Sequence, residues 1–277
     1  ALEAAVALHQ SGDREGALQV YRTVLRYAPA SNQEIKALAA ACYRLGNYDD
    51  ALRHYQTAAA REPRNAAVRS DLGVVLSQLG RLEEAAAAFE AALALDPDNA
   101  RAHSNYGDLL TDLKRYDEAE AHCRRALEID PKFADALNNL GRVLERRGNP
   151  ALAGEAYGAA LAGKPDHAAA SFNLGCLAHE ADRPGQSARY FDQAVRHGAD
   201  FAEAHYNHAH QLLRQGDLVR GFEEFEWRWQ CKAFPSRRRD FCQPAWDGSD
   251  LAGKTILLHA EQGLGDTIQF VRYVPFV

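Results

Sequence analysis

Apolar and polar positions recur with a period of 34 residues from the start of the chain to about residue 232. Within each period the apolar residues have helical spacing in two blocks, each followed by turn residues. A glycine or a substitute closes the first block at Gly12, Gly46, Gly80, Lys114, Gly148, Asp182 and Gly216. A period of this length predicts a solenoid, because each repeat is too small to enclose a core alone and buries its apolar face against its neighbours.

Small residues mark where the two helices of each repeat should cross. With position 1 at residues 32, 66, 100, 134, 168 and 202, positions 8 and 20 are glycine, alanine or serine in all seven repeats, for example Gly141 and Ala153. A bulky residue would not fit such a crossing. Position 24 is aromatic in six repeats, with Cys123 as the exception. The second helices should stop before the prolines Pro29, Pro63, Pro97, Pro131 and Pro165.

This pattern, in stretches such as NNLGRVLERRGNPALAGEAYGAALAGKPD, closely resembles the tetratricopeptide repeat and covers about five-sixths of the chain. The resemblance implies an all-α, right-handed superhelix, that is, an α-solenoid. The predicted domain is residues 1–232, with repeats at 1–31, 32–65, 66–99, 100–133, 134–167, 168–201 and 202–232.

In tetratricopeptide superhelices the first helix of each repeat lines a concave groove, with positions 2, 5, 6, 9, 12 and 13 facing into it. Position 6 is asparagine in four successive repeats, at Asn105, Asn139, Asn173 and Asn207. A carboxamide matches the donor and acceptor of a peptide group, so these residues are candidates for binding a peptide backbone. The spacing resembles the asparagine ladder of the O-linked N-acetylglucosamine transferases. The alternative is that each asparagine bonds within its own repeat.

The sequence argues against two other kinds of binding site. The carboxylate-clamp subfamily needs a lysine at position 5 and an asparagine at position 9 of one repeat, and no repeat has both, which argues against a chaperone adaptor. His205, His208 and His210 cluster in the last repeat, but no third ligand is placed. We therefore expect no metal and interpret His208 as a contact to whatever follows the repeats.

Composition removes further classes. The net charge of -6 argues against a nucleic-acid groove, and there is no apolar stretch of membrane-spanning length. The five cysteines are scattered and form no CxxC pair, which favours a reducing, cytoplasmic setting. Cys42 and Cys123 are expected as small buried residues. No cofactor is expected for this chain.

The pattern changes after the repeats. Phe222, Phe225 and Trp229 predict an aromatic stripe on the last helix, and residues 233–250 predict a linker. Residues 251–277 then predict a strand, a glycine loop and a helix, the start of a truncated α/β domain. Gly263, Gly265 and Asp266 form a candidate phosphate loop, and a tight turn without ligand is the alternative.

The stretch AWDGSDLAGKTILLHAEQGLGDTIQFVRYVP resembles the junction between tetratricopeptide repeats and a glycosyltransferase-like domain in bacterial proteins. That resemblance implies a nucleotide-sugar substrate for a complete domain and makes Asp266 a candidate base. The longer spacing from Asp266 to Pro275 departs from the family pattern. Catalysis is not expected of the chain itself, because one strand and one helix cannot enclose a site.

The sequence therefore predicts a superhelix that binds a protein or extended peptide in its groove, as the substrate-docking arm of a bacterial glycosyltransferase-like protein. The alternative is a non-catalytic scaffold for protein assembly. The apolar residues of the tail should pack on the aromatic end of the solenoid around Phe225 and Trp229, or self-associate through the C-terminal fragment with another copy.

Overall fold

The computed structural model describes residues 16, 19, 20, 23 and 31–234. Every regular element in this part of the chain is a helix, as expected of an all-α solenoid. The chain divides into two compact units, and the division falls after His197. The candidate α/β fragment at 251–277 and most of the first repeat lie outside the described residues.

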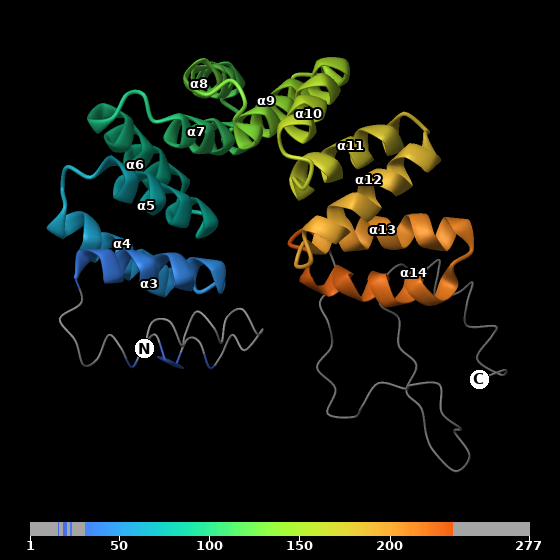
Figure 1. Ribbon diagram of the computed structural model, residues 1–277, viewed down its shortest axis with the longest axis horizontal. Helices are drawn as coiled ribbons and strands as arrows, with labels where there is room; N and C mark the ends of the chain where they lie inside the picture. Colours follow the sequence, from blue (N-terminus) through green and yellow to red (C-terminus); the bar gives the residue numbers. More distant parts are fainter. Residues whose placement is uncertain (1–15, 17–18, 21–22, 24–30, 235–277) are drawn as a thin grey trace, which may run out of the picture. The chain divides into compact units, whose positions relative to one another are not determined.

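The helices form consecutive pairs along the chain (Figure 1). The first helices are α3 (Asn32–Arg44), α5 (Ala66–Gln78), α7 (Ala100–Asp112), α9 (Ala134–Arg146), α11 (Ala168–Glu180) and α13 (Ala202–Gln215). The second helices are α4 (Tyr48–Arg61), α6 (Leu82–Leu95), α8 (Tyr116–Ile129), α10 (Pro150–Gly163), α12 (Pro184–His197) and α14 (Leu218–Phe225), and α14 continues into the 3-10 helix η1 (Glu226–Gln230). Successive first helices begin 34 residues apart.

Local chemistry sets the helix ends. The Asn65 and Asn99 side chains accept hydrogen bonds from the amides of Val68 and Ala102, which caps α5 and α7. Helix α4 ends at Arg61, two residues before Pro63, and α6, α8 and α10 end in the same relation to their prolines.

The turn between the paired helices needs a left-handed residue. Gly46, Gly80, Gly148 and Gly216 have φ between 73° and 85° there. Lys114 and Asp182 take the same place with φ of 61° and 51°, so the two substitutes in the sequence do adopt the glycine conformation.

The paired helices meet closely at the predicted small positions. A Cβ added to Gly141 in α9 would lie 2.4 Å from Cε1 of Tyr157 in α10, and Gly73 and Gly175 face Phe89 and Phe191 in the same way. The ring at position 24 therefore occupies the space that the missing side chain at position 8 leaves. These rings are buried, so the small and large positions form one interlocking core.

Within the first unit each second helix contacts the next first helix, so the core continues from pair to pair. Cys42 and Cys123 are buried in it as free thiols, as expected. Burial raises the pKa of Cys123 to about 12, which keeps this thiol protonated and unreactive.

The predicted single aromatic stripe of Phe222, Phe225 and Trp229 is not formed. Helix α14 ends at Phe225, and the change to 3-10 geometry turns the later residues away from the α-helical spacing. The buried Arg228 guanidinium lies 4.7 Å from the Phe225 ring centroid and 4.4 Å from that of Trp229, whereas Phe222 is exposed. A cation lies between two of the three rings because its charge is attracted to their faces.

Candidate functional site

The candidate site is the face made by positions 5 and 6 of the first helices α7, α9 and α11. These positions hold Ser104 and Asn105, Asn138 and Asn139, and Phe172 and Asn173. Hydrogen bonds show that position 6 lies beside position 5 of the preceding repeat, at Asn139 with Ser104 and at Asn173 with Asn138. We call this surface the first-helix face.

Asn139 joins α9 to α7. Its Nδ2 donates to the backbone oxygen of Ser104 at 3.2 Å and to the Ser104 hydroxyl at 3.1 Å. The partners are 35 residues apart in sequence and become neighbours only because the repeats stack. The amide group of Asn139 is thus used to hold two repeats together.

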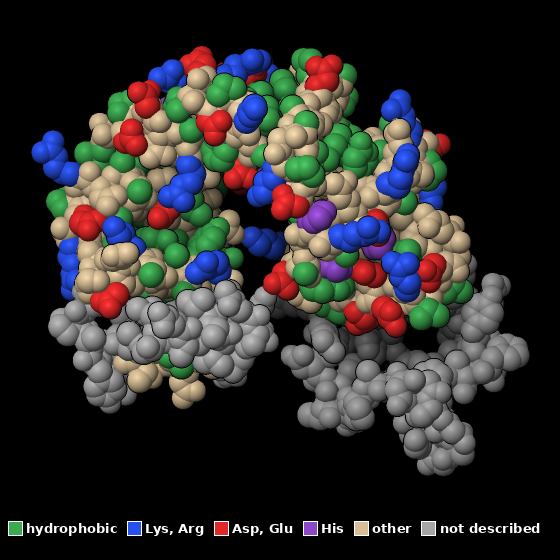
Figure 2. All heavy atoms as spheres, viewed as in Figure 1, with side chains coloured by type: hydrophobic (Ala, Val, Ile, Leu, Met, Phe, Trp, Pro, Cys, Tyr) green, Lys and Arg blue, Asp and Glu red, His purple; other side chains and the backbone are tan. Residues whose placement is uncertain are grey.

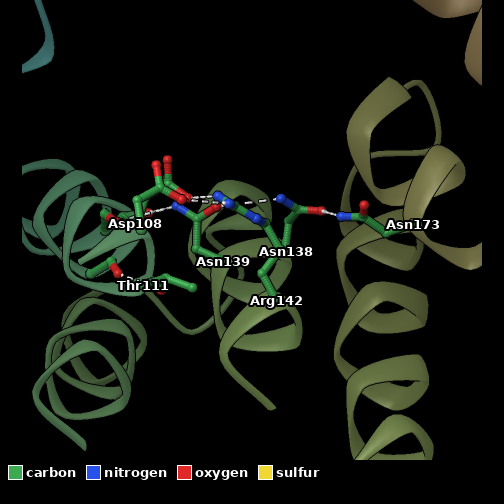
Figure 3. Close-up of polar contacts among 9 residues, drawn as sticks. Asp108, Thr111, Asn138, Asn139, Arg142 and Asn173 are labelled. Atoms are coloured by element: carbon green, nitrogen blue, oxygen red, sulfur yellow. Dashed lines mark hydrogen bonds and ion pairs between the residues drawn. The ribbon is translucent and has the colours of Figure 1, made fainter. Parts of the chain in front are cut away.

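Asn173 joins α11 to α9 in a similar way. Its Nδ2 donates to Oδ1 of Asn138 at 2.9 Å, and Nδ2 of Asn138 donates to Oδ1 of Asn139 at 3.3 Å. Figure 3 shows the resulting chain of carboxamides from Asn173 through Asn138 to Asn139, and the bonds of Asn139 to Ser104 extend it to a third repeat. Among the described residues nothing donates to Oδ1 of Asn173, so this acceptor remains open.

The other two predicted asparagines differ from this arrangement. No described residue hydrogen bonds to the half-buried Asn105 side chain, which leaves its donors and acceptor open. In the second unit, Nδ2 of Asn207 donates to the Glu203 oxygen of its own helix at 2.8 Å. The structure therefore joins Asn139 and Asn173 through Asn138, and it connects neither Asn105 nor Asn207 to that chain.

Ion pairs between repeats flank the carboxamides. Arg142 on α9 bonds to Asp108 and to Asp112, the latter at 3.1 Å, and both carboxylates belong to α7 (Figure 3). Arg101 bonds to Asp71 at 2.7 Å across the preceding pair of repeats. Burial raises the pKa of Asp71, and the arginine opposes that shift.

Sequence reasoning missed these ion pairs, although a signal existed. Arg101 with Asp71, Arg142 with Asp112 and Arg147 with Asp117 are each 30 residues apart. A separation of 30 is one repeat less one helical turn, so such residues lie side by side on neighbouring helices. Opposite charges at this separation predict inter-repeat ion pairs.

A histidine pair, the buried His103 and the partly buried His122, lies in the repeat of α7 and α8. His103 Nε2 lies 3.0 Å from the Pro97 oxygen, which only accepts, so this nitrogen carries the proton in the neutral ring. Its Nδ1 then accepts from His122 Nδ1 at 2.8 Å. Burial lowers the pKa of His122, and the neighbouring His103 lowers it further.

The histidines of the last repeat contact aromatic rings and a carboxylate. His205 stacks on Trp227 with ring centroids 4.1 Å apart and faces the Glu224 carboxylate, which also lies 3.9 Å from His208 Nδ1. His210 packs edge-on to Phe225. The described residues contain no cluster of three metal-ligating side chains. The candidate phosphate loop of Gly263, Gly265 and Asp266 lies outside the described residues.

No helix in the described part of the chain is long and apolar enough to cross a bilayer.

Comparison with known families identifies the class. Sequence models of the tetratricopeptide repeat match residues 36–99, 70–132, 122–155 and 172–235, which together make up more than half of the chain. The chain therefore belongs to the tetratricopeptide repeat family. It is similar to the protein FlbA of Caulobacter vibrioides, with 34% identity over 64 residues, which are 23% of this chain and 11% of FlbA. The chain thus matches only about a tenth of that relative.

Solved structures share the fold. The tetratricopeptide repeat protein TTC0263 of Thermus thermophilus aligns over 66% of this chain and 100% of its own, with a TM-score of 0.61 and 20% identity. A chain of the APC/C hetero-tetramer Cut9–Hcn1 aligns over 80% of this chain and 44% of its own, with a TM-score of 0.64 and 16% identity. At this identity the likeness concerns the fold alone.

Proposed function

We propose that this protein is an interaction module that binds an extended peptide along the first-helix face of α7, α9 and α11. The observation that carries the proposal is the set of open carboxamide groups beside closed ones. Asn105 keeps its donors and acceptor, and Asn173 keeps its Oδ1, while Asn138 and Asn139 hold the helices in place. A surface with fixed helices and open peptide-like groups suits a peptide backbone.

The spacing suits an extended chain. Packed helices lie roughly 8–10 Å apart, and an extended peptide advances about 3.3 Å per residue, so one asparagine meets about every third residue. The face itself contains no carboxylate, and the nearby Asp71 and Asp108 are paired with Arg101 and Arg142. Backbone groups, more than charged side chains, are therefore what this face recognises.

A solved structure with the same fold supports a role in protein assembly. It is a chain of the APC/C hetero-tetramer Cut9–Hcn1. For the present chain, binding of a protein or peptide is a proposal that rests on the first-helix face.

The test is a binding screen with the full chain against a library of unrelated unstructured peptides. Asn105→Ala should weaken many peptides alike, by about 2- to 10-fold, because a lost hydrogen bond is worth about 0.5–1.5 kcal/mol. The matched control is Asn149→Ala. Asn149 is exposed, lies in a turn, and its side chain makes no capping hydrogen bond. Loss confined to particular sequences, or equal binding by the variant, contradicts the proposal.

A narrower proposal is that this module is the substrate-docking arm of a bacterial glycosyltransferase-like protein. It rests on the sequence of residues 245–275 alone, including Gly263, Gly265 and Asp266. The test of this narrower proposal is a transfer assay with nucleotide sugars, using the protein as it occurs in the cell. Asp266→Asn should abolish transfer while peptide binding persists, and Asn105→Ala should reduce both. Peptide binding without any transfer by the wild type supports the alternative, a non-catalytic scaffold.

A further inference from the structure

Helix α14 exposes three large apolar side chains at the end of the described solenoid. Leu218, Val219 and Phe222 are 56%, 73% and 62% exposed. They lie within five residues on one short helix, so they form a contiguous surface, which we call the end patch. Exposed apolar side chains are ordinary when scattered, but a contiguous set indicates a contact surface.

The repeat pattern shows that the end patch lacks the contact that a following first helix makes in earlier repeats. Phe222 occupies position 21, where earlier second helices have Leu52 and Ala86, both buried. A Cβ added to Gly154 at the same position would lie 3.7 Å from Leu177 on the following first helix α11. Position 21 is therefore the place where the next first helix packs, and no described helix follows α14 and η1.

Val219 strengthens the inference because no earlier described second helix has a large apolar residue at position 18. Position 18 is acidic in three earlier second helices, at Asp49, Glu83 and Asp117. An acidic residue in the first turn stabilises a helix through its dipole, and α14 has none there. If the start of α14 stayed in water, an acidic residue at position 18 would stabilise the helix more than valine does. The valine is therefore suited to contact with an apolar partner.

We propose that residues 251–277 of the same chain cover the end patch. Sixteen residues, 235–250, separate this segment from Phe234, a length that spans about 50 Å when extended, so the segment can reach any part of α14. Its acidic and basic residues are equal in number, and its large apolar residues are Leu251, Ile256, Leu257, Leu258, Leu264, Ile268, Phe270, Val271, Tyr273, Val274, Phe276 and Val277.

The tether favours this occupant over a second copy. A segment joined by a short linker has an effective concentration in the millimolar range, far above that of another molecule in dilute solution. The proposed contact differs from the one predicted from the sequence, which was centred on Phe225 and Trp229. Phe225 packs against Tyr206 and Arg228, and Trp229 packs against Phe234, so the open surface is the end patch and not those two rings.

The first experiment uses the sign of a stability change in the full chain. Val219→Glu places at position 18 the kind of residue that three other repeats tolerate, so the variant should fold. If the segment covers the patch, the melting temperature falls, because a charge is buried. A rise in melting temperature, the helix-dipole effect in water, overturns the proposal.

The second experiment identifies the occupant by hydrogen exchange and limited proteolysis of residues 251–277. Phe222→Glu should speed exchange and cleavage there, whereas the matched control Leu152→Glu, at a 50% exposed leucine in the first turn of α10, should not. Unchanged exchange in Phe222→Glu overturns the proposal. So does a wild-type dimer by light scattering that Phe222→Glu converts to a monomer, since a second copy then covers the patch.

Discussion

At the scale of single residues, four asparagines with the same repeat position have different environments. Asn139 and Asn173 bond to the preceding repeat, Asn207 bonds to its own helix, and Asn105 bonds to no described residue. Only Asn207 shows the bonding within one repeat that was the alternative to a peptide ladder, whereas Asn139 and Asn173 bond between repeats, and peptide binding at Asn105 stays a proposal. Stability measurements can separate the structural asparagines from the open one.

We expect Asn139→Ala to lower the free energy of unfolding by about 0.5–1.5 kcal/mol, since it removes the hydrogen bonds to Ser104. Asn105→Ala should leave the free energy of unfolding within about 0.5 kcal/mol of the wild type. Urea denaturation followed by circular dichroism measures both. Equal effects in the two variants would show that the bonds of Asn139 do not stabilise the repeats.

The partly buried His122, paired with the buried His103, makes stability depend on pH. The folded-state pKa of His122 is lowered from 6.5, so below that pH the unfolded chain takes up a proton that the folded chain does not. The stabilisation is complete above pH 6.5 and is lost as the pH falls toward the folded-state pKa. The melting temperature should therefore decrease between pH 7.5 and pH 5.5.

His122→Gln isolates this contribution, because glutamine retains a donor for His103 Nδ1 and does not titrate. The variant should lose less of its melting temperature than the wild type over the same pH range. His54, whose pKa burial also lowers, contributes equally to both proteins. Parallel pH profiles of wild type and variant would contradict the assignment to His122.

At the scale of helices, glycine to alanine changes should have opposite signs in one repeat. Gly141 in α9 faces the Tyr157 ring, and a Cβ there would lie 2.4 Å from it, whereas a Cβ on the exposed Gly158 in α10 meets nothing within 4 Å. Gly141→Ala should destabilise by about 1–3 kcal/mol through overpacking. Gly158→Ala should stabilise by about 0.5–1 kcal/mol, because alanine favours the helix.

Thermal denaturation of the two variants measures this difference directly. Both substitutions add one methyl group to a helix interior, so each controls for the intrinsic helix propensity of the other. A stabilising Gly141→Ala would mean that α9 and α10 do not cross at the observed distance.

At the scale of the whole molecule, basic and acidic side chains of the described residues are intermingled, and many of them are paired. Basic and acidic side chains alternate over the face of the protein in Figure 2, and the carboxylates Asp71, Asp108 and Asp112 have arginine partners. The net charge is only -6 over 277 residues. The proposed peptide site should therefore bind with little electrostatic steering.

Peptide affinity should accordingly change by less than about 2-fold between 50 mM and 500 mM salt, because contacts to uncharged groups are not screened. Fluorescence anisotropy of a labelled peptide selected in the screen measures this. A steep fall in affinity with salt would mean that the ligand displaces Arg101 or Arg142 from its carboxylates.

Much of the fold follows from local sequence. The period, the small residues at positions 8 and 20, the ring at position 24 and the prolines specify which segments are helices and which sides are buried. Even Lys114 and Asp182 could be predicted in the glycine conformation, because the period places them there. Of the candidate site, the position of the four asparagines on the first helices could be predicted, and their hydrogen bonds could not.

The sequence by itself therefore determined a tetratricopeptide solenoid, because periodic burial requires only neighbours along the chain. The tertiary structure alone decided that Asn139 is bonded while Asn105 is open, and that Arg142 faces two carboxylates from another repeat. It also decided that Arg228 enters between Phe225 and Trp229 where a helical stripe was expected. Hydrogen bonds and ring contacts depend on side-chain geometry at the level of ångströms, which a pattern of residue types does not contain.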